Sequence, residues 1–349
     1  MAGYNRAIRE ALENKTFINN IRRVFDGESR NNINNIALWG AEPTINAKYF
    51  AEFSHELLDH FPNCETFMFS TNALLGADCL YGDFVIPLME YAESHKRPIS
   101  FELQFSLDGP PEFNDDSRHP GATASTLNAI MECAKRLPED LQFFTLKMHT
   151  KATLDVSYMR IMLERGLPSF KWYYKFFNDI QLEAEKYASN KRCRVALAGT
   201  PTIVDPGYYT KDDGITFAKW LNMMRQLDVD DLPCYCHDSL FMQALPQVGE
   251  MLEHDNPVAD AFYRWSCSAG KNNITIDYEG NLYSCNRLCK NSAIPGMTEK
   301  LSAMKAHTNI HTVDKKWIRK TWGMQLFHHD LLSRRWFADC VLIPMALAG

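Results

Sequence analysis

Polar side chains follow three strand-like runs in the first third of the chain and could together bind a small polar ligand. The segments that contain them are Gly40-Ala41-Glu42-Pro43 at the end of the first run, Thr71-Asn72 at the end of the second, and the segment with Ser106, Asp108 and Arg118 at the end of the third. A carboxylate such as that of Glu42 accepts hydrogen bonds from an ammonium group, and the planar guanidinium of an arginine matches a carboxylate. Each segment alone is also compatible with a turn or a helix start. Together they favour one site.

Cysteine is the second residue type with chemical potential, and the chain contains 10. We expect Cys64, Cys79, Cys133 and Cys193, which are scattered, to be small buried apolar residues. The other six fall later in the chain, and five of them lie between Cys234 and Cys289. In a protein without a secretory signal we expect cysteines to stay reduced. A cluster of cysteines then favours metal binding.

A predicted β-hairpin over residues 273–285 lies between Cys267 and Cys285, with Gly280 in its turn. A hairpin brings its two ends together, so both thiolates can face one metal cluster. Cys289 and Cys340 are the further candidate ligands. The segment Cys234-Tyr235-Cys236-His237 is another candidate cluster, and its alternative is a loop with spare thiols.

Strand-like and helical runs alternate through the first two-thirds of the chain, which predicts an α/β fold with a parallel sheet. The expected strands are residues 35–40, 65–70, 99–107, 142–149 and 169–177. Helical spacing of apolar residues occurs in 5–25, 50–61, 84–91, 127–137 and 156–165, and a further helix is expected around 212–227. Thr123 or Ser125 is available to begin the fourth of these, Asp155 the fifth, and Gly166 is suited to end the fifth. The carboxyl ends of parallel strands meet at one edge, where ligands bind.

Composition limits the possible classes of protein. Apolar residues make up 46% of the 349 residues and charged residues 23%, as in ordinary globular proteins. A formal net charge of −6 argues against a broad nucleic-acid-binding face. The sequence has no run of the roughly 20 apolar residues that span a bilayer and no secretory pattern at its start. We therefore expect a cytoplasmic protein without nucleic-acid or membrane partners.

These segments resemble the radical S-adenosylmethionine (SAM) superfamily, in the branch with a C-terminal SPASM iron–sulfur domain. That branch includes anaerobic sulfatase-maturating enzymes and peptide maturases. The resemblance covers residues 35–150 and 265–289, through the stretches WGAEPTIN, FSTNALL, FSLDGPPEFNDDSR and CSAGKNNITIDYEGNLYSC. It implies a partial (β/α)6-type barrel in residues 1–200 and a smaller SPASM-like domain in residues 230–349.

The resemblance also implies a role for each candidate residue. Gly40 to Pro43 would hold the amino group of SAM, with Ala41 where the family has glycine. Ser106 and Arg118 would contact the ribose and carboxylate of SAM. Asn72 belongs to a Thr-Asn-Gly motif in which Ala73 replaces glycine, and Thr71 and Asp108 complete the expected set. Cys267, Cys285, Cys289 and Cys340 would hold an auxiliary [4Fe–4S] cluster, although Ile343 and Ala346 stand where the family has further cysteines.

The Cys-x3-Cys-x2-Cys motif that binds the catalytic cluster of this superfamily is absent from the sequence. In the family one helix separates that motif from Gly-Gly-Glu-Pro, and residues 5–25 are expected to be this helix. The cysteine loop is then expected just before Met1, in a longer parent protein. The alternative is a chain that has lost its cluster.

Three functions therefore stay open. The parent protein is expected to cleave SAM reductively, with electrons from a flavodoxin or ferredoxin, and to abstract hydrogen from a peptide or protein. The second possibility is a pseudoenzyme or peptide-binding module without a catalytic cluster. The third is an unrelated α/β enzyme with zinc at the late cysteines. His119, His149 and His237 are possible acid–base groups, and the sequence assigns a role to none of them.

Overall fold

The computed structural model describes residues 2–38, 42–153 and 155–197, together with Asp212, Thr216, Lys219, Trp220, Met223, Leu227 and residues 275–276 and 282–283. Contacts divide the chain into two compact units. Residues 2–153 and 171–197 belong to the first unit, and the other described residues belong to the second. The strands that carry the candidate site all lie in the first unit.

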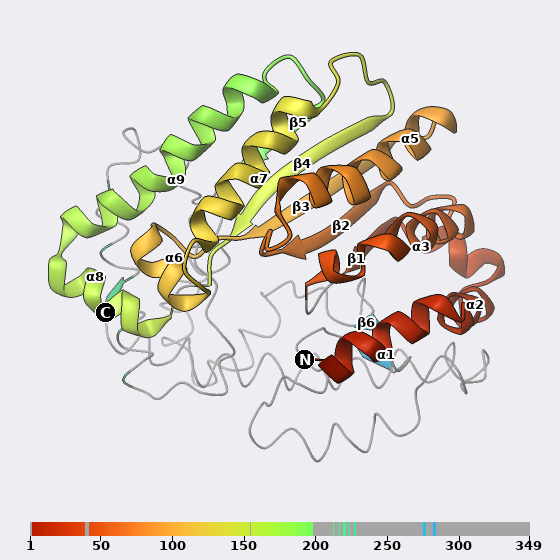
Figure 1. The fold of residues 1–349 in the computed structure, drawn as a ribbon, viewed down its shortest axis with the longest axis horizontal. Coiled ribbons are helices and arrows are strands. Elements are labelled where there is room, and N and C mark those ends of the chain that lie inside the picture. The colour runs from red at the N-terminus through yellow and green to blue at the C-terminus, as the bar shows by residue number, and fades with distance from the viewer. Residues whose placement is uncertain are drawn as a thin grey trace, which may run out of the picture. The chain divides into compact units, whose positions relative to one another are not determined.

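The first unit is built on a parallel sheet of five strands in the order β1-β2-β3-β4-β5 (Figure 1). The strands are β1 (Asn35–Leu38), β2 (Thr66–Thr71), β3 (Ile99–Ser106), β4 (Phe144–Lys151) and β5 (Cys193–Ala196). Strands that follow one another along the chain are neighbours in the sheet, as short crossover connections require. The α/β class, the parallel sheet and the first four predicted strands are confirmed, except that residues 39–40 lie outside the described part.

Helices and helical turns fill the connections. They are α1 (Ala2–Glu13), α2 (Thr16–Val24), η1 (Gly27–Asn32), η2 (Pro43–Asn46), α3 (Ala47–His60), α4 (Gly76–Cys79), a π-helical turn η3 (Leu80–Val85), α5 (Ile86–Ser94), α6 (Pro111–Ser117), α7 (Ala122–Arg136), α8 (Val156–Arg165) and α9 (Leu167–Ala188). Asp155 accepts a hydrogen bond from the backbone N–H of Ser157 at 2.8 Å, and Gly166 ends α8 with a positive φ of 72°. Both predicted caps of this helix are therefore confirmed.

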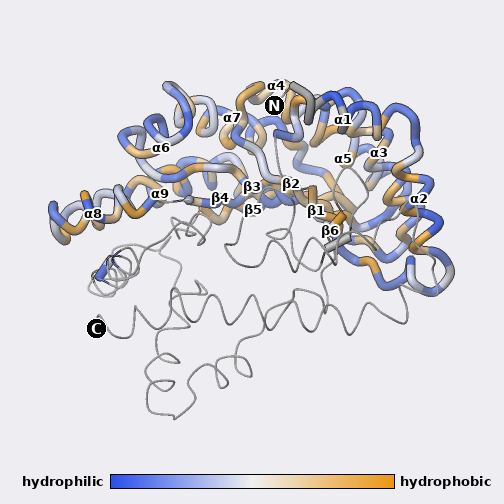
Figure 2. Tube along the Cα trace, turned by 90° about the horizontal axis from the view of Figure 1, so that it is seen from below, coloured by the Kyte–Doolittle hydropathy of each residue, from blue (hydrophilic) through white to orange (hydrophobic). Residues whose placement is uncertain are grey.

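One face of the sheet is covered by helices, among which α3, α5 and α7 lie over the strands (Figures 1 and 2). Phe50 of α3 is the centre of the packing on this face. Its ring centroid lies 5.6 Å from that of Phe67, 5.9 Å from that of Phe69, 4.4 Å from that of Phe84 and 6.2 Å from that of Phe101. All five rings are buried. Edge-on and tilted aromatic pairs of this kind hold α3 against β2 and β3.

The strands alternate between their two faces with the expected period of two. In β3 the buried residues are Ile99, Phe101, Leu103 and Phe105, whereas Ser100, Glu102, Gln104 and Ser106 are partly exposed. Strand β4 repeats the pattern. The apolar side chains face the helices, and a polar second face results.

The prediction of a strand at residues 169–177 was wrong, because this segment is part of the 22-residue helix α9. Phe170, Tyr173, Tyr174, Phe177 and Ile180 are buried and recur at intervals of three and four residues. The run is rich in aromatic residues, which favour strands, but the helical period decides its structure. The fifth strand is β5, which starts at Cys193.

Two helix boundaries also differ from the prediction. The expected helix over 5–25 is two helices, broken where Lys15 has a φ of 54° and where the side chain of Asn14 accepts a hydrogen bond from the N–H of Thr16. Helix α7 begins at Ala122 after Gly121 (φ 82°), so neither Thr123 nor Ser125 is its N-cap. In the second unit β6 (Thr275–Ile276) and β7 (Leu282–Tyr283) pair antiparallel, which confirms the pairing of the predicted hairpin.

Phe50→Ala is expected to lower the free energy of unfolding by about 3–5 kcal/mol, since it leaves a cavity among four buried rings. Urea unfolding measures the change. Leu182→Ala is the matched control, because that side chain on α9 is 49% exposed and its loss should cost under about 0.5 kcal/mol. Equal losses in the two variants would contradict this account of the core.

Candidate functional site

The carboxylate of Glu42 joins the ends of β1 and β2. Its Oε1 accepts hydrogen bonds from the hydroxyls of Thr44 and Thr71, each at 2.7 Å, and Oε2 accepts one from the backbone N–H of Asn72 at 2.7 Å. The Thr44 N–H also donates to Oε1, at 3.3 Å, so Glu42 caps the turn η2. Glu42 is buried. Each carboxylate oxygen has about two acceptor positions, and the described residues use one of those on Oε2, which leaves the other for a further donor.

The turn after β2 is held by helix α7. Ser125 donates to the carbonyl of Ala73 at 2.8 Å, and Thr126 to the carbonyl of Asn72 at 3.4 Å. The side-chain oxygen of Asn72 accepts from the N–H of Leu74 at 2.9 Å and closes an Asx turn. Ala73 has a φ of 55°, a conformation that suits glycine. Ala73 therefore lies at a position whose backbone needs a positive φ.

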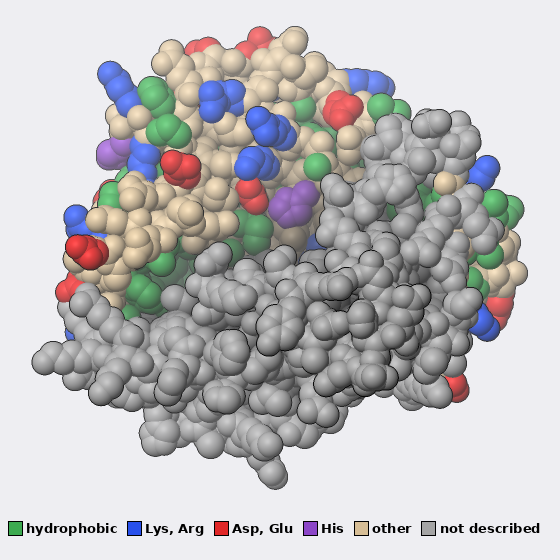
Figure 3. Space-filling model, turned by 180° about the vertical axis from the view of Figure 1, so that it is seen from behind, with side chains coloured by type: hydrophobic (Ala, Val, Ile, Leu, Met, Phe, Trp, Pro, Cys, Tyr) green, Lys and Arg blue, Asp and Glu red, His purple; other side chains and the backbone are tan. Residues whose placement is uncertain are grey.

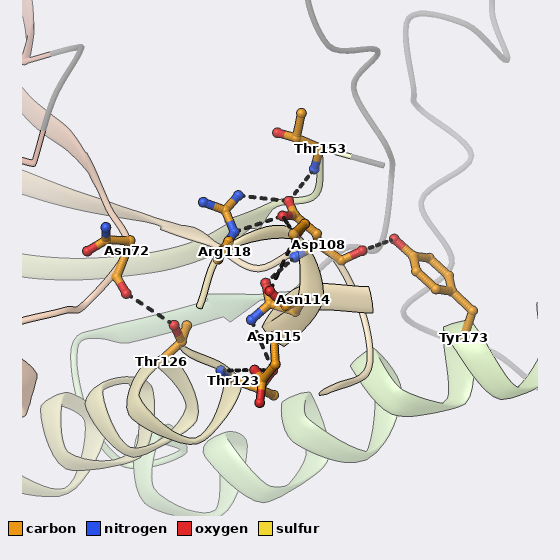
Figure 4. A network of polar contacts seen from close by, with 10 residues as sticks. Asn72, Asp108, Asn114, Asp115, Arg118, Thr123, Thr126, Thr153 and Tyr173 are labelled. Carbon is orange, nitrogen blue, oxygen red and sulfur yellow. Dashed lines mark hydrogen bonds and ion pairs between the residues drawn. The ribbon is translucent and has the colours of Figure 1, made fainter. Parts of the chain in front are cut away.

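Asp108 forms the second centre of the site, just beyond β3 (Figure 4). Its carboxylate Oδ1 accepts hydrogen bonds from Arg118 Nη2 at 2.8 Å and from the N–H of Thr153 at 2.6 Å. The other oxygen, Oδ2, accepts from the hydroxyl of Ser117 at 2.9 Å and lies 2.7 Å from Arg118 Nε in ion-pair geometry. Asp108 is only 3% exposed, so its charge needs all these partners.

The segment between Asp108 and α7 is cross-linked by side chains. Asn114 accepts from the N–H of Asp108 and donates to the hydroxyl of Thr123, both at 2.9 Å. Asp115 accepts from the N–H and the hydroxyl of Thr123, at 2.7 and 2.5 Å, and so satisfies the first turn of α7. Burial is the largest single effect on the Asp115 carboxyl and raises its pKa, but the hydrogen bonds from Thr123, Gly121 and Asn114 together outweigh it and lower the pKa below its usual value.

Helix α9 supports the same segment from the other side. The hydroxyl of Tyr173 is fully buried and donates to the carbonyl of Asp108 at 2.9 Å. The ring lies so close to Gly109 that a Cβ there would be 2.6 Å from Tyr173 Cε2, and Gly109 has a φ of 149°. Only glycine fits at this position, for both reasons.

The structure brings most of the predicted site residues to one edge of the sheet. Pro43, Thr71, Asn72 and Asp108 surround the ends of β1 to β3, and Ser106 ends β3. Arg118 lies among them but is paired with Asp108, and its Nη1 points away from that carboxylate (Figure 4). Gly40 and Ala41 lie outside the described residues.

The structure describes four of the cysteines. Cys64, Cys133 and Cys193 are buried, as predicted, and Cys79 is half-buried. Burial raises the pKa of Cys64 to about 11, that of Cys133 to about 12 and that of Cys193 to about 11, so these thiols are poor ligands and nucleophiles. The predicted ligands Cys267, Cys285, Cys289 and Cys340, and the segment 234–237, lie outside the described residues. Within the described part no group of three His, Cys, Asp or Glu could hold a metal ion.

The sequence did not identify Thr44, Thr123, Thr153 or Tyr173 as parts of this site. Glu42 stands two residues before Thr44 and directly before a proline. This pattern is typical of a helix N-cap and could have predicted the contact between Glu42 and Thr44. Thr153 contributes its backbone, and Tyr173 lies 65 positions from its partner, so no local pattern reveals either of them.

Comparisons with protein families, with curated proteins and with solved structures found no match for this chain. In the part of the chain that the structure describes, no helix has both the length and the apolar character needed to cross a membrane.

Ala73→Gly is expected to leave the free energy of unfolding nearly unchanged, because relief of the positive φ, about 1 kcal/mol, offsets the lost methyl group and the greater chain entropy. Ala92→Gly is the matched control, since Ala92 is equally buried but lies in helix α5. It should cost about 1–2 kcal/mol. Chemical denaturation compares the two, and equal costs would exclude strain at Ala73.

Asp108→Asn is expected to lower the free energy of unfolding by about 3 kcal/mol, because it leaves the Arg118 guanidinium without its buried partner. Adding Arg118→Met to this variant should cost less than the sum of the single changes. A double-mutant cycle in urea measures the coupling, and strict additivity would show that the ion pair contributes nothing.

Proposed function

We propose that the first unit is the SAM-binding part of a radical SAM enzyme of the SPASM branch. The proposal rests on one observation. Hydrogen bonds at one edge of the sheet connect the strand ends whose sequences resemble the family's SAM motifs. Glu42 from the first motif contacts Thr71 and Asn72 from the second, and α7 joins the second to the third. The five-stranded parallel sheet is compatible with the partial barrel that the resemblance implies.

The charges of the site suit SAM. Glu42, Asp108 and Arg118 together carry a net negative charge at neutral pH, and SAM is a net cation because it has a sulfonium and an ammonium besides its carboxylate. Oε2 of Glu42 would accept a hydrogen bond from the ammonium. Nη1 of Arg118 would donate to the carboxylate, while Asp108 holds the guanidinium in place. Ser106 would contact the ribose.

The hydrogen bonds that hold the two carboxylates also suit them to bind a ligand. Both carboxylates are buried, and each accepts hydrogen bonds from more than one element. The remaining acceptor and donor positions are therefore fixed before a ligand arrives, so little ordering entropy is lost on binding.

When bound to a reduced iron–sulfur cluster, SAM would supply the radical chemistry for hydrogen abstraction. An auxiliary cluster would be held by Cys267, Cys285, Cys289 and Cys340. The Cys-x3-Cys-x2-Cys motif that would hold the catalytic cluster is absent from this sequence. The chain's own part in the reaction is to bind and orient SAM at the sheet edge. A peptide or protein substrate and a flavodoxin or ferredoxin as electron donor belong to the same proposal.

A second candidate is a module that binds SAM or a peptide without catalysis. The observation that favours it is the missing Cys-x3-Cys-x2-Cys motif in the sequence. Both candidates predict a formed ligand site. They differ in whether the gene, expressed with any in-frame sequence upstream of Met1, gives a protein that cleaves SAM after anaerobic reconstitution with iron and sulfide.

Isothermal titration calorimetry of the full chain with SAM tests the site directly. Glu42→Gln should weaken SAM binding by roughly tenfold or more, because the amide removes a charge that faces the ammonium. Glu183→Gln on the exposed surface of α9 is the control and should bind as the wild type does. S-adenosylhomocysteine, which lacks the sulfonium charge, should bind more weakly than SAM.

Folding is monitored separately, since Glu42 also joins two strands. If Glu42→Gln keeps the wild-type far-UV circular dichroism spectrum and melting temperature and binds SAM with unchanged affinity, the proposed site is wrong. Absence of SAM binding by the folded wild-type chain would remove the proposal altogether.

A further inference from the structure

The second face of the sheet carries rows of polar side chains from adjacent strands. In parallel strands, residues in register point to the same face. The register places Met68, Glu102, Lys147 and Arg194 in one row across β2 to β5. Ser70, Gln104 and His149 form the next row toward the carboxyl edge. Figure 3 views the molecule from this side and shows basic, acidic and histidine side chains gathered in the coloured region.

The first row contains more positive than negative charge. Lys147 Nζ lies 2.9 Å from Oε1 of Glu102, which neutralises one cation. Arg194 is the register neighbour of Lys147 on the other side and is exposed. Two cations directly opposite each other on neighbouring strands repel. An anion beside them would relieve this repulsion.

The second row adds neutral hydrogen-bonding groups beside these cations. Nε2 of Gln104 lies 3.0 Å from Nε2 of His149. Burial lowers the pKa of His149, against a smaller raising effect of Glu102, so the imidazole is neutral at pH 7. With the Gln104 amide donating to Nε2, the ring proton resides on Nδ1 and makes this atom a donor. Gln104 Oε1 is buried and accepts no hydrogen bond from any of the described residues, so it is open to a donor group of a ligand.

We propose that this face of β3, β4 and β5 binds an oxyanion, a carboxylate or a phosphate, through the guanidinium of Arg194, the ammonium of Lys147 and the Nδ1–H of His149. Arg194 provides the planar fork that holds two oxygens of one anion, and Lys147 adds a point charge. Gln104 keeps the imidazole oriented, and its free oxygen accepts from a donor group of the same ligand. The site uses residues along the strands rather than beyond their ends, and it does not require SAM binding at Glu42.

The test uses the full chain with N-acetylglutamate and with inorganic phosphate as probes, and N-acetylglutamine as the less charged counterpart of the first. Proton NMR follows the imidazole C–H signals of His149, assigned with His149→Gln, and calorimetry gives the affinities. We expect one or both anions to shift the His149 signals. Arg194→Gln and Lys147→Met should each weaken binding by roughly tenfold, the change that corresponds to about 1.4 kcal/mol.

Lys175→Gln is the matched control, since Lys175 is an exposed cation on α9. It should bind both anions as the wild type does. Binding of N-acetylglutamate alone would assign a carboxylate ligand, and binding of phosphate alone would assign a phosphate ligand. The proposal is overturned if neither probe shifts the His149 signals, or if Arg194→Gln and Lys175→Gln lose equal affinity, which indicates general charge attraction. Because Glu42→Gln leaves this face unchanged, loss of SAM binding in that variant does not affect the result.

Discussion

The burial of the Asp108 carboxylate is the constraint on which the rest of the site depends. A charged group with 3% exposure is stable only if nearby donors replace the water it has lost. Those donors come from Arg118, Ser117 and the backbone of Thr153, so the end of β3, helix α6 and the end of β4 must meet at this point. The backbone of Asp108 adds contacts to Asn114 and to Tyr173 of α9. One buried charge therefore determines the positions of several elements.

Glu42 plays the same part at the other end of the edge, where it joins β1 to β2. The two carboxylates differ in what they leave for a ligand. The acceptor positions of the Asp108 carboxylate are occupied by protein donors, and Arg118 neutralises its charge. Glu42 also accepts hydrogen bonds from protein donors, but it has no cationic partner among the described residues. The absence of a cationic partner for Glu42 among the described residues is the reason why the proposed ligand is a cation. Arg118 uses Nη2 and Nε to bind Asp108, so only Nη1 is left for the proposed contact with a ligand carboxylate.

The two faces of the sheet show how one strand period serves two purposes. Alternate residues of β3 and β4 pack under the helices, and the residues between them present charges and amides on the second face. Packing around Phe50 holds α3 against β2 and β3, and the backbone pairing of the strands aligns the side chains of the second face in rows. An apolar core thus positions polar groups that it does not contact.

The sequence by itself determined the class of the fold, four of the five strands and the shared edge of the polar strand ends. It could do so because the period of two, the helical period and the geometry of parallel strands are local properties. It failed at residues 169–177, where aromatic residues suit both a strand and a helix. Only the tertiary structure decided that α9 supports Asp108, that Asp115 caps α7 and that Arg118 pairs with a buried carboxylate. These outcomes depend on desolvation and on contacts between elements distant in sequence, such as the 65 positions between Asp108 and Tyr173, which no local pattern encodes.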